Sequence, residues 1–254
     1  MMLMQPEEIM FRIIIKDTKE ELNAEAFKLV KEVLDTKEQP VLGLATGSSP
    51  VGLYELMIKD HKENGTSYKN VLTWNLDEYV GIPRTHEQSY WTFMRKNLFD
   101  YIDIPEENTH VPVGDAEDEE AECRKYEQSM EGHPVDLQVL GIGSDGHIAF
   151  NEPGTSFDSV THIVDLEEST INDNARFFDN DPTKVPKQAI SQGLATIMRA
   201  KKIVLFATGE NKADAVKGMI SGPVTTDCPA SILQDHQDVT ILLDHAAASK
   251  LKNF

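Results

Sequence analysis

Short apolar runs alternate with amphipathic segments along the chain, and the two kinds of segment predict two kinds of element. Runs rich in Val, Ile, Leu and Phe are typical of strands buried on both faces. Such runs occupy residues 11–16, 41–45, 71–79, 136–143, 201–209 and 238–244. Between them, apolar positions recur every three or four residues, as they do along one face of a helix. On the first expected helix that face holds Leu22, Ala26, Leu29, Val30 and Val33.

The alternation predicts an α/β fold with a mostly parallel central sheet and helices on both faces. Further helices are expected around Leu53, near residues 88–101 and 117–131, and from about Asn211. No internal repeat, low-complexity tract or Gly/Ser-rich linker interrupts the pattern, and a length of 254 residues suits one large domain. We therefore expect a single domain over residues 1–254, with residues around 160–187 as a candidate lid.

Charge and cysteine content narrow the classes of partner. The formal net charge is −19 and the pI is about 4.7, so nucleic acid and anionic membranes are disfavoured as partners. Cys123 and Cys228 are too few and too far apart in sequence to indicate a disulfide framework or a zinc cluster. Residues 1–17 lack a basic region and a long apolar stretch. We therefore expect no signal peptide and a cytoplasmic location.

Ligands of parallel α/β sheets bind beyond the carboxyl ends of the strands, so the loops after the expected strands are the places to search. After the second expected strand, Thr46, Gly47, Ser48 and Ser49 form a turn of small residues before a helix that starts near Pro50. Backbone N–H groups and hydroxyls at a helix N-terminus suit a phosphate. The turn matches neither a Walker loop nor a dinucleotide fingerprint. An ordinary strand–helix turn with a serine cap explains it equally well.

Two acidic residues, Asp77 and Glu78, follow a strongly apolar run. Neighbouring side chains on a strand point to opposite sides, so at most one of the two faces a cleft beyond the sheet. Asp77 is the better candidate if Asn75 and Tyr79 are the other residues that face inward. A carboxylate desolvated there can serve as a base near neutral pH. In a chain this acidic, two solvated acids at a sheet edge are the alternative.

The segment 141–154, GIGSDGHIAFNEPG, gathers Asp145, His147 and Glu152 in one loop. Histidine is the side chain best matched to proton transfer at neutral pH. The two acids can hold its tautomer and raise its basicity if the loop folds back and brings both near the ring. An Asp-Gly pair on its own is a common turn. A histidine with two acids in the same loop favours a catalytic site.

Two cations lie in segments that fit the same region. Arg176 stands beside paired aromatic residues in a segment of poor strand character, and Lys212 lies near the start of an expected helix. The helix dipole disfavours a cation at a helix N-terminus, so Lys212 suggests an anion there. The alternative for both is a solvated surface position, where most Lys and Arg side chains lie.

Five segments together resemble those of glucosamine-6-phosphate deaminases, in that family's order and spacing over nearly the whole chain. They read LATGSSP, NLDEYVG, SYWTFMRKNLFDYIDIP, GIGSDGHIAFNEPG and ARFFDNDPTKVPKQAIS. The resemblance implies a Rossmann-like α/β sandwich, in agreement with the alternation of strands and helices. It also implies conversion of glucosamine 6-phosphate and water to fructose 6-phosphate and ammonium in amino-sugar catabolism, with no metal or organic cofactor.

The resemblance implies a role for each candidate residue. His147 would transfer the proton that opens the sugar ring, and Asp145 and Glu152 would orient and tune it. Asp77 would take the proton from C2 of the open-chain sugar, giving an enediol-type intermediate from which the amine departs. The phosphate would be bound by Thr46, Gly47, Ser48, Ser49, Arg176 and Lys212.

Two other functions stay open on the sequence. A 6-phosphogluconolactonase-type hydrolase has a similar fold and also uses an Asp-Gly-His turn, but residues 148–152 follow the deaminase pattern. A non-catalytic sugar-phosphate sensor would keep the phosphate loop and lose the chemistry, and the retention of Asp77, His147 and Glu152 argues against it. Members of the resembled family occur as monomers and as hexamers, so a monomer or a homo-oligomer is expected.

The resemblance also bears on regulation. Allosteric members of that family bind the phosphate of N-acetylglucosamine 6-phosphate between subunits, through basic residues just after the catalytic loop. From Gly154 to Glu168 this chain has no Lys or Arg. The charged or titratable residues there are Asp158, His162, Asp165, Glu167 and Glu168. We therefore expect no activation by this effector.

Overall fold

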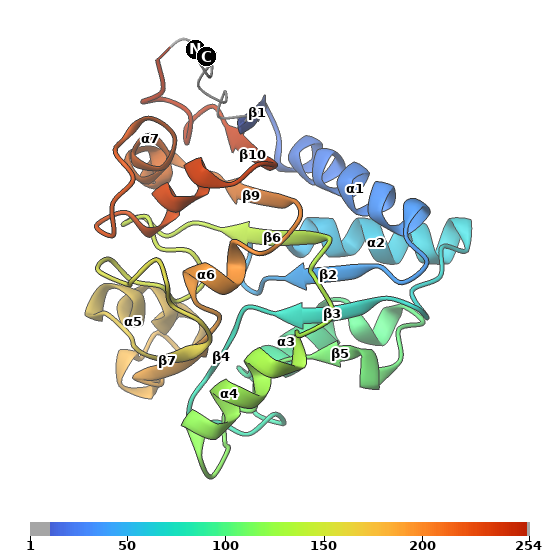
Figure 1. The fold of residues 1–254 in the computed structure, drawn as a ribbon. Helices are drawn as coiled ribbons and strands as arrows, with labels where there is room; N and C mark the ends of the chain where they lie inside the picture. The colour runs from blue at the N-terminus through green and yellow to red at the C-terminus, as the bar shows by residue number, and fades with distance from the viewer. Residues whose placement is uncertain (1–10, 253–254) are drawn as a thin grey trace, which may run out of the picture.

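The computed structural model describes residues 11–252 of the 254-residue chain (Figure 1). The expectation about a signal peptide rests largely on residues 1–10, which lie outside the described residues, as do residues 253–254. Within residues 11–252 no helix is both long and apolar enough to cross a membrane.

A parallel sheet of seven strands forms the centre of the molecule, in the order β1-β10-β9-β6-β2-β3-β5. The strands are β1 (Phe11–Lys16), β2 (Val41–Leu44), β3 (Leu72–Asn75), β5 (Thr109–His110), β6 (Leu137–Gly141), β9 (Ile203–Ala207) and β10 (Val239–Asp244). Nearly all side chains of β2, β3, β6, β9 and β10 are buried, which explains why the sequence shows these strands as continuous apolar runs. The two edge strands differ, since β1 is only partly buried and β5 is a polar pair that the apolar pattern does not predict. The predicted α/β class with a mostly parallel sheet is confirmed.

Helices cover both faces of this sheet. They are α1 (Lys19–Thr36), α2 (Val51–Asn64), α3 (Tyr90–Asn97), α4 (Glu119–Ser129), α5 (Glu168–Asn174), α6 (Leu194–Ile197) and α7 (Ala213–Ser221). Short 3₁₀ turns are η1 (Phe99–Tyr101), η2 (Glu106–Asn108), η3 (Ala175–Phe177), η4 (Pro182–Lys184), η5 (Glu210–Lys212) and η6 (Pro229–Asp235). The chain crosses the sheet in one direction up to β5 and then reverses. Right-handed crossovers therefore put α1, α2 and α3 on one face and α4, α6 and α7 on the other (Figure 1).

The first helix shows how closely the apolar pattern matches the packing. Leu22, Ala26, Val30 and Val33 are buried against the sheet, whereas Leu29 is only partly buried at the margin of that face. The helix begins at a capping box in which Thr18 and Glu21 bond each other's backbone N–H groups.

The apolar run at 71–79 is not the single strand that the sequence predicts. It divides at Leu76 into β3, in the main sheet, and β4 (Asp77–Tyr79), in a second sheet. That sheet is antiparallel, in the order β4-β8-β7, with β7 (His162–Asp165) and β8 (Gln188–Ser191). Leu76 joins the two sheets, since its N–H bonds Leu44 of β2 and its carbonyl accepts from Gln192.

A second apolar cluster packs the small sheet against the segment that connects β7 to β8. It contains Tyr79, Phe150, Val164, Leu166, Ala175, Phe178, Val185 and Ala189. Residues 160–187, the candidate lid of the sequence analysis, hold β7, α5, η3 and η4. This segment lies on the side toward which the arrowheads of β2, β3 and β6 point (Figure 1).

Candidate active site

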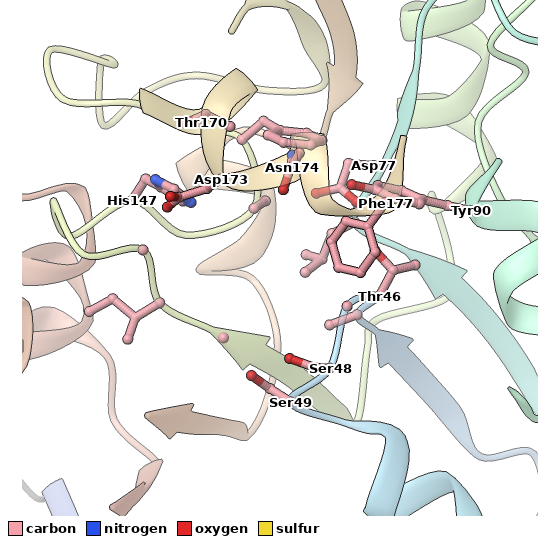
Figure 2. A pocket seen from close by; sticks show the side chains of 18 of the residues that line it. Thr46, Ser48, Ser49, Asp77, Tyr90, His147, Thr170, Asp173, Asn174 and Phe177 are labelled. Carbon is pink, nitrogen blue, oxygen red and sulfur yellow. The ribbon is translucent and has the colours of Figure 1, made fainter. Parts of the chain in front are cut away.

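One pocket of about 480 Å³ opens beyond the carboxyl ends of β2, β6 and β9, beneath α5 and η3 (Figure 2). Its lining comes from the turn after β2, from β4, from the loops after β6 and β9, and from α5 and η3. Eight of the predicted site residues line it: Thr46, Gly47, Ser48, Ser49, Asp77, His147, Arg176 and Lys212. Asp145 and Glu152 are not part of the lining but contact His147.

Asp77 begins β4 and faces the pocket, with 7% of the residue exposed. Burial and the neighbouring charge of Glu78 raise the pKa of Asp77 to about 8, while His147 opposes the rise. Tyr79 lines the pocket as expected, but Asn75 does not, because the strand breaks at Leu76 between them. The alternative of two solvated acids is wrong, since both carboxylates are buried.

Glu78 points away from the pocket lining, into the start of α3. Its carboxylate accepts backbone N–H groups from Tyr79 and Tyr90 at 2.9 Å and from Trp91 at 3.1 Å. Burial raises the pKa of Glu78 to about 7, although these hydrogen bonds and the charge of Arg84 lower it. The two adjacent acids therefore have different positions: Asp77 faces the pocket, and Glu78 binds the first turn of α3, which bears Tyr90.

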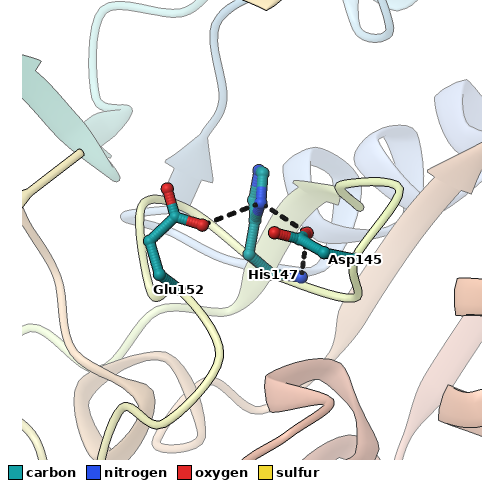
Figure 3. Close-up of side chains that lie close together, drawn as sticks. All are labelled: Asp145, His147 and Glu152. Carbon is teal, nitrogen blue, oxygen red and sulfur yellow. Dashed lines mark hydrogen bonds and ion pairs between the residues drawn. The ribbon is translucent and has the colours of Figure 1, made fainter. Parts of the chain in front are cut away.

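His147 meets both acids of its loop at the same ring nitrogen (Figure 3). Its Nδ1 lies 2.7 Å from Asp145 Oδ1 and 3.4 Å from Glu152 Oε2. Asp145 Oδ1 also accepts the backbone N–H of His147 at 3.1 Å. Burial alone would lower the pKa of His147, but the two carboxylates outweigh it and raise the pKa to about 9. The pKa of Asp145 is held well below its usual range, because the bonds and charge of His147 outweigh its burial.

Two glycines permit this tight loop. A Cβ at Gly143 would lie 2.3 Å from the His147 ring, so no side chain fits there. Gly146 has a φ of +91°, and a Cβ on it would lie 2.7 Å from Cys228 Sγ. The glycines around the Asp-Gly-His core therefore bring the acids to the ring.

Asp145, His147 and Glu152 are also close enough together to suggest metal ligands. Both acids approach the same Nδ1, and the 2.7 Å contact with Asp145 has the length of a hydrogen bond, as in an acid–histidine pair. Among residues 11–252, His147 Nδ1 and Glu152 Oε2 are buried without a well-aligned hydrogen-bond partner.

The turn after β2 supplies the opposite end of the pocket. Gly47 has a φ of +84°, and Ser48 and Ser49 are exposed. Figure 2 shows both serines in the turn after β2. The backbone N–H groups of residues 46–49 donate to no other group in the part of the chain that the structure describes. Pro50 is the N-cap of α2 and no side chain caps this helix, so the serine-cap alternative is wrong. Backbone N–H groups and hydroxyls without partners among the described residues therefore lie at a helix N-terminus, an arrangement that suits a bound anion.

The two predicted cations reach the same pocket from different segments. Arg176 lies in η3, its guanidinium 4.7 Å from the centre of the Phe177 ring. Lys212 is half-buried at the N-cap of α7, and burial and the charge of Arg176 lower its pKa, against Asp173 and Asp145. Neither cation forms an ion pair with the described residues. Two like charges that share a pocket favour an anionic ligand between them.

Comparison with known proteins identifies the family. The family model for glucosamine-6-phosphate isomerases/6-phosphogluconolactonase matches residues 16–242. The chain belongs to this family. Glucosamine-6-phosphate deaminase of Thermoanaerobacter sp. (strain X514) is 50% identical over 239 residues, 94% of each chain. Glucosamine-6-phosphate deaminase 2 of Bacillus subtilis (strain 168) is 49% identical over 244 residues, 95% of this chain and 98% of the relative.

Solved structures of the glucosamine-6-phosphate isomerase/6-phosphogluconolactonase family share the fold. That of a monomeric glucosamine-6-phosphate deaminase has a TM-score of 0.92 at 42% identity, covering 95% of this chain and 100% of that chain. A 6-phosphogluconolactonase from Trypanosoma cruzi has a TM-score of 0.78 at 22% identity, covering 97% and 98%. At 22% identity, the similarity to the 6-phosphogluconolactonase supports the fold alone.

In this member of the family the pocket contains residues that the sequence reasoning missed. Tyr90, Thr170, Asp173 and Asn174 all line it. Tyr90 lies in the family-like segment SYWTFM, a signal that carries no role by itself. Thr170 and its neighbours occupy a polar stretch, EESTINDN, with no motif that marks a site. Only the fold of residues 160–187 over the pocket brings them to it.

Proposed function

We propose that this chain converts glucosamine 6-phosphate and water to fructose 6-phosphate and ammonium, an aldose–ketose isomerisation with deamination in amino-sugar catabolism. Relatives that are about half identical over nearly their whole length carry the name glucosamine-6-phosphate deaminase. The single observation that carries the proposal is that Asp77 and His147 line one pocket whose other end is the anion-binding turn.

Ring opening is the first step, and His147 serves it. The His147 imidazolium donates a proton to the ring oxygen O5 and takes the proton of the C1 hydroxyl, so that the C1–O5 bond breaks, an aldehyde forms and the imidazolium is restored. Asp145 and Glu152 fix Nδ1, which leaves Nε2 for the sugar. They also stabilise the imidazolium that starts and ends this step.

Isomerisation follows at C2, where Asp77 is the base. It removes the C2 proton, the electron pair forms the C1–C2 double bond, and the aldehyde oxygen gains a proton. Reprotonation at C1 gives an imine at C2, and water replaces the nitrogen, which leaves as ammonium. A C2–H is a weak acid, so a base with a raised pKa near the working pH suits this step.

The phosphate end fixes the substrate for both steps. The turn from Thr46 to Ser49 offers N–H groups and hydroxyls, and Arg176 and Lys212 supply positive charge. Each charge-assisted hydrogen bond to the phosphate contributes about 1.5–3 kcal/mol. This binding holds C1 and C2 between His147 and Asp77 without taking part in the chemistry.

Ammonium release from glucosamine 6-phosphate tests the proposal. We expect stoichiometric ammonium and fructose 6-phosphate, with poor turnover of unphosphorylated glucosamine. Hydrolysis of 6-phosphogluconolactone without ammonium release would identify a lactonase instead. Tight binding of the sugar phosphate with no turnover of either substrate would identify a sensor.

The setting of this activity is part of the proposal. We place the enzyme in the cytoplasm, as a monomer or homo-oligomer with a small sugar phosphate as its partner, and with neither nucleic acid nor a membrane. The steps above are proton transfers, the opening of the C1–O5 bond and the hydrolysis of an imine, and side chains and water suffice for all of them. No metal or organic cofactor is therefore required.

A further inference from the structure

Thr170, in the lid segment, connects that segment to the catalytic loop. It is on α5, is 5% exposed, and lines the pocket (Figure 2). Its hydroxyl donates to Glu152 Oε1 at 2.6 Å. This is the length of a charge-assisted hydrogen bond to a carboxylate. Residues 18 positions apart in sequence are thereby joined inside the protein.

The Glu152 carboxylate depends on this bond. It is 5% exposed, and Thr170 is the one well-aligned hydrogen-bond donor that it has among residues 11–252. Its other oxygen, Oε2, is buried 3.4 Å from His147 Nδ1. With Oε1 held by Thr170, the carboxylate plane is fixed and Oε2 is directed at the ring. Without that bond, Glu152 can rotate about its side-chain torsions.

The same segment carries a residue of the phosphate site. α5 runs directly into η3, which holds Arg176, so only six positions separate the hydroxyl from the guanidinium. A phosphate bound by Arg176 fixes η3, and a fixed η3 fixes α5. One rigid element, α5 with η3, therefore carries both Arg176, which binds the substrate's phosphate, and Thr170, which orients the ring-opening histidine through Glu152.

We propose that Thr170 is a positioning residue that couples the placement of the α5–η3 lid segment to the Glu152–His147 pair. The proposal rests on the proposed function, because it assigns ring opening to His147. In this arrangement the sugar ring is opened efficiently only when the lid segment lies over the pocket. Thr170 does not touch the reacting atoms; it acts through Glu152.

Protonation of His147 is the property that this coupling changes. The charged groups that act on the ring are Asp145 and Glu152 from its own loop and Asp77 from β4. Lys212, at the start of α7, acts on Asp145. Loss of the Thr170 hydroxyl removes the hydrogen bond to Oε1 and frees the Glu152 carboxylate to turn from the ring. The pKa of His147 then falls, since one of the two groups that raise it is weakened.

Thr170→Val removes the hydroxyl and keeps the branched shape. We expect a kcat about 10–100-fold lower and a fall of about one unit in the pKa of His147. Both the pH profile of kcat/KM and the ring resonances of His147 in an NMR titration report that pKa. Thr170→Ser keeps the donor and should behave like the parent. Ser169→Ala, at the exposed neighbouring position of α5, is the control for a general effect on the helix.

A double-mutant cycle separates coupling from packing. If Thr170 acts through Glu152, then Thr170→Val should cost almost nothing further in a Glu152→Gln background. Additive losses would overturn the proposal, and so would a Thr170→Val enzyme with an unchanged His147 titration. If Thr170→Val does not fold, the same comparison is made with Thr170→Ala against Thr170→Ser. A parent enzyme that releases no ammonium would refute the proposed function instead, while the NMR titration would still test the coupling.

Discussion

Asp77 is the residue on which the proposed chemistry depends most directly. We expect Asp77→Asn to lower kcat by about 10²–10⁴-fold, because it removes the base at C2. The KM for the sugar phosphate should change little, since the phosphate is bound at the other end of the pocket. Steady-state kinetics measure both quantities. Asp235→Asn, an exposed carboxylate in η6, serves as the control, and a near-normal kcat in Asp77→Asn would remove the assignment.

The same substitution has an expected effect on stability. The pKa of Asp77 is higher in the folded protein than its usual value of 3.8. Asp77 therefore contributes its full stabilisation below pH 3.8, where it is protonated, and this contribution is lost as the pH rises through about 8. Asp77→Asn should accordingly raise Tm at alkaline pH, by about 2–4 °C for each kcal/mol recovered, and by less in acid. A Tm that falls equally at both pH values would contradict this account of the burial.

The pH dependence of activity gives a separate test of the paired acids. Asp77 must be ionised to act as a base, so kcat/KM should rise with pH up to about 8. Glu78→Gln removes the neighbouring negative charge that raises this pKa, and the amide keeps an oxygen for the N–H groups of α3. We expect this variant to shift the acid limb to lower pH, whereas Glu63→Gln, at an exposed position of α2, should leave it in place. An acid limb near the usual carboxyl pKa in the parent would show that Asp77 is not the titrating base.

At the scale of elements, the sequence predicted what apolar patterning can encode. The five inner strands of the main sheet lie in continuous apolar runs because both of their faces are buried, and such runs stand out in any chain. The edge strand β5, a Thr-His pair, gave no such signal. β7 and β8 did not stand out, since each has only four residues and mixes polar with apolar positions. The break at Leu76 is also invisible locally. It depends on β8, more than 100 residues away, which takes Asp77–Tyr79 into a second sheet.

The candidate site was predictable for a related reason. Its loops follow conspicuous strands, so the rule about carboxyl ends selects them. Thr170 was missed because its role depends on a tertiary contact, the bond to Glu152, which no spacing in the sequence reveals. Glu78 was considered only as a rival to Asp77, although its actual contacts are with the first turn of α3.

The elements that bear the cations allow a test of the phosphate end. Arg176→Ala and Lys212→Ala should each raise the KM for glucosamine 6-phosphate, by about 1.5–3 kcal/mol in binding for each charge-assisted bond lost. The expected fall in kcat is smaller, because neither side chain reaches the reacting carbons. Lys217→Ala is a matched control, being an exposed lysine on α7 beyond Lys212. If glucosamine were turned over as efficiently as its phosphate, the anion-site interpretation would be wrong.

At the scale of the whole molecule, the acidic surface contrasts with the pocket. A net charge of −19 disfavours anionic ligands in general, yet the pocket brings together Arg176 and Lys212, neither of which forms an ion pair within residues 11–252. An anion is therefore accepted at this place because of local groups, and surfaces without such groups should reject one.

By the resemblance to glucosamine-6-phosphate deaminases, the stretch 154–168 corresponds to the effector-phosphate site of allosteric members, and in this chain it contains no Lys or Arg. His162 is half-buried, and its Nδ1 lies 2.7 Å from the carbonyl of Val160. The carboxylates around it are all exposed: Asp158, Asp165, Glu167 and Glu168. A phosphate near them would be repelled, and one histidine would not offset four acids even when protonated.

We therefore expect N-acetylglucosamine 6-phosphate to leave the kinetics unchanged. Substrate-saturation curves near neutral pH, with and without millimolar effector, should be hyperbolic and superimposable. Solution mass, measured under the same conditions, tells whether a subunit interface exists in which an effector could bind. A sigmoidal curve that becomes hyperbolic on adding the effector would contradict the prediction. It would mean that cations from another part of the chain, or from a second subunit, compensate for the acids of residues 154–168.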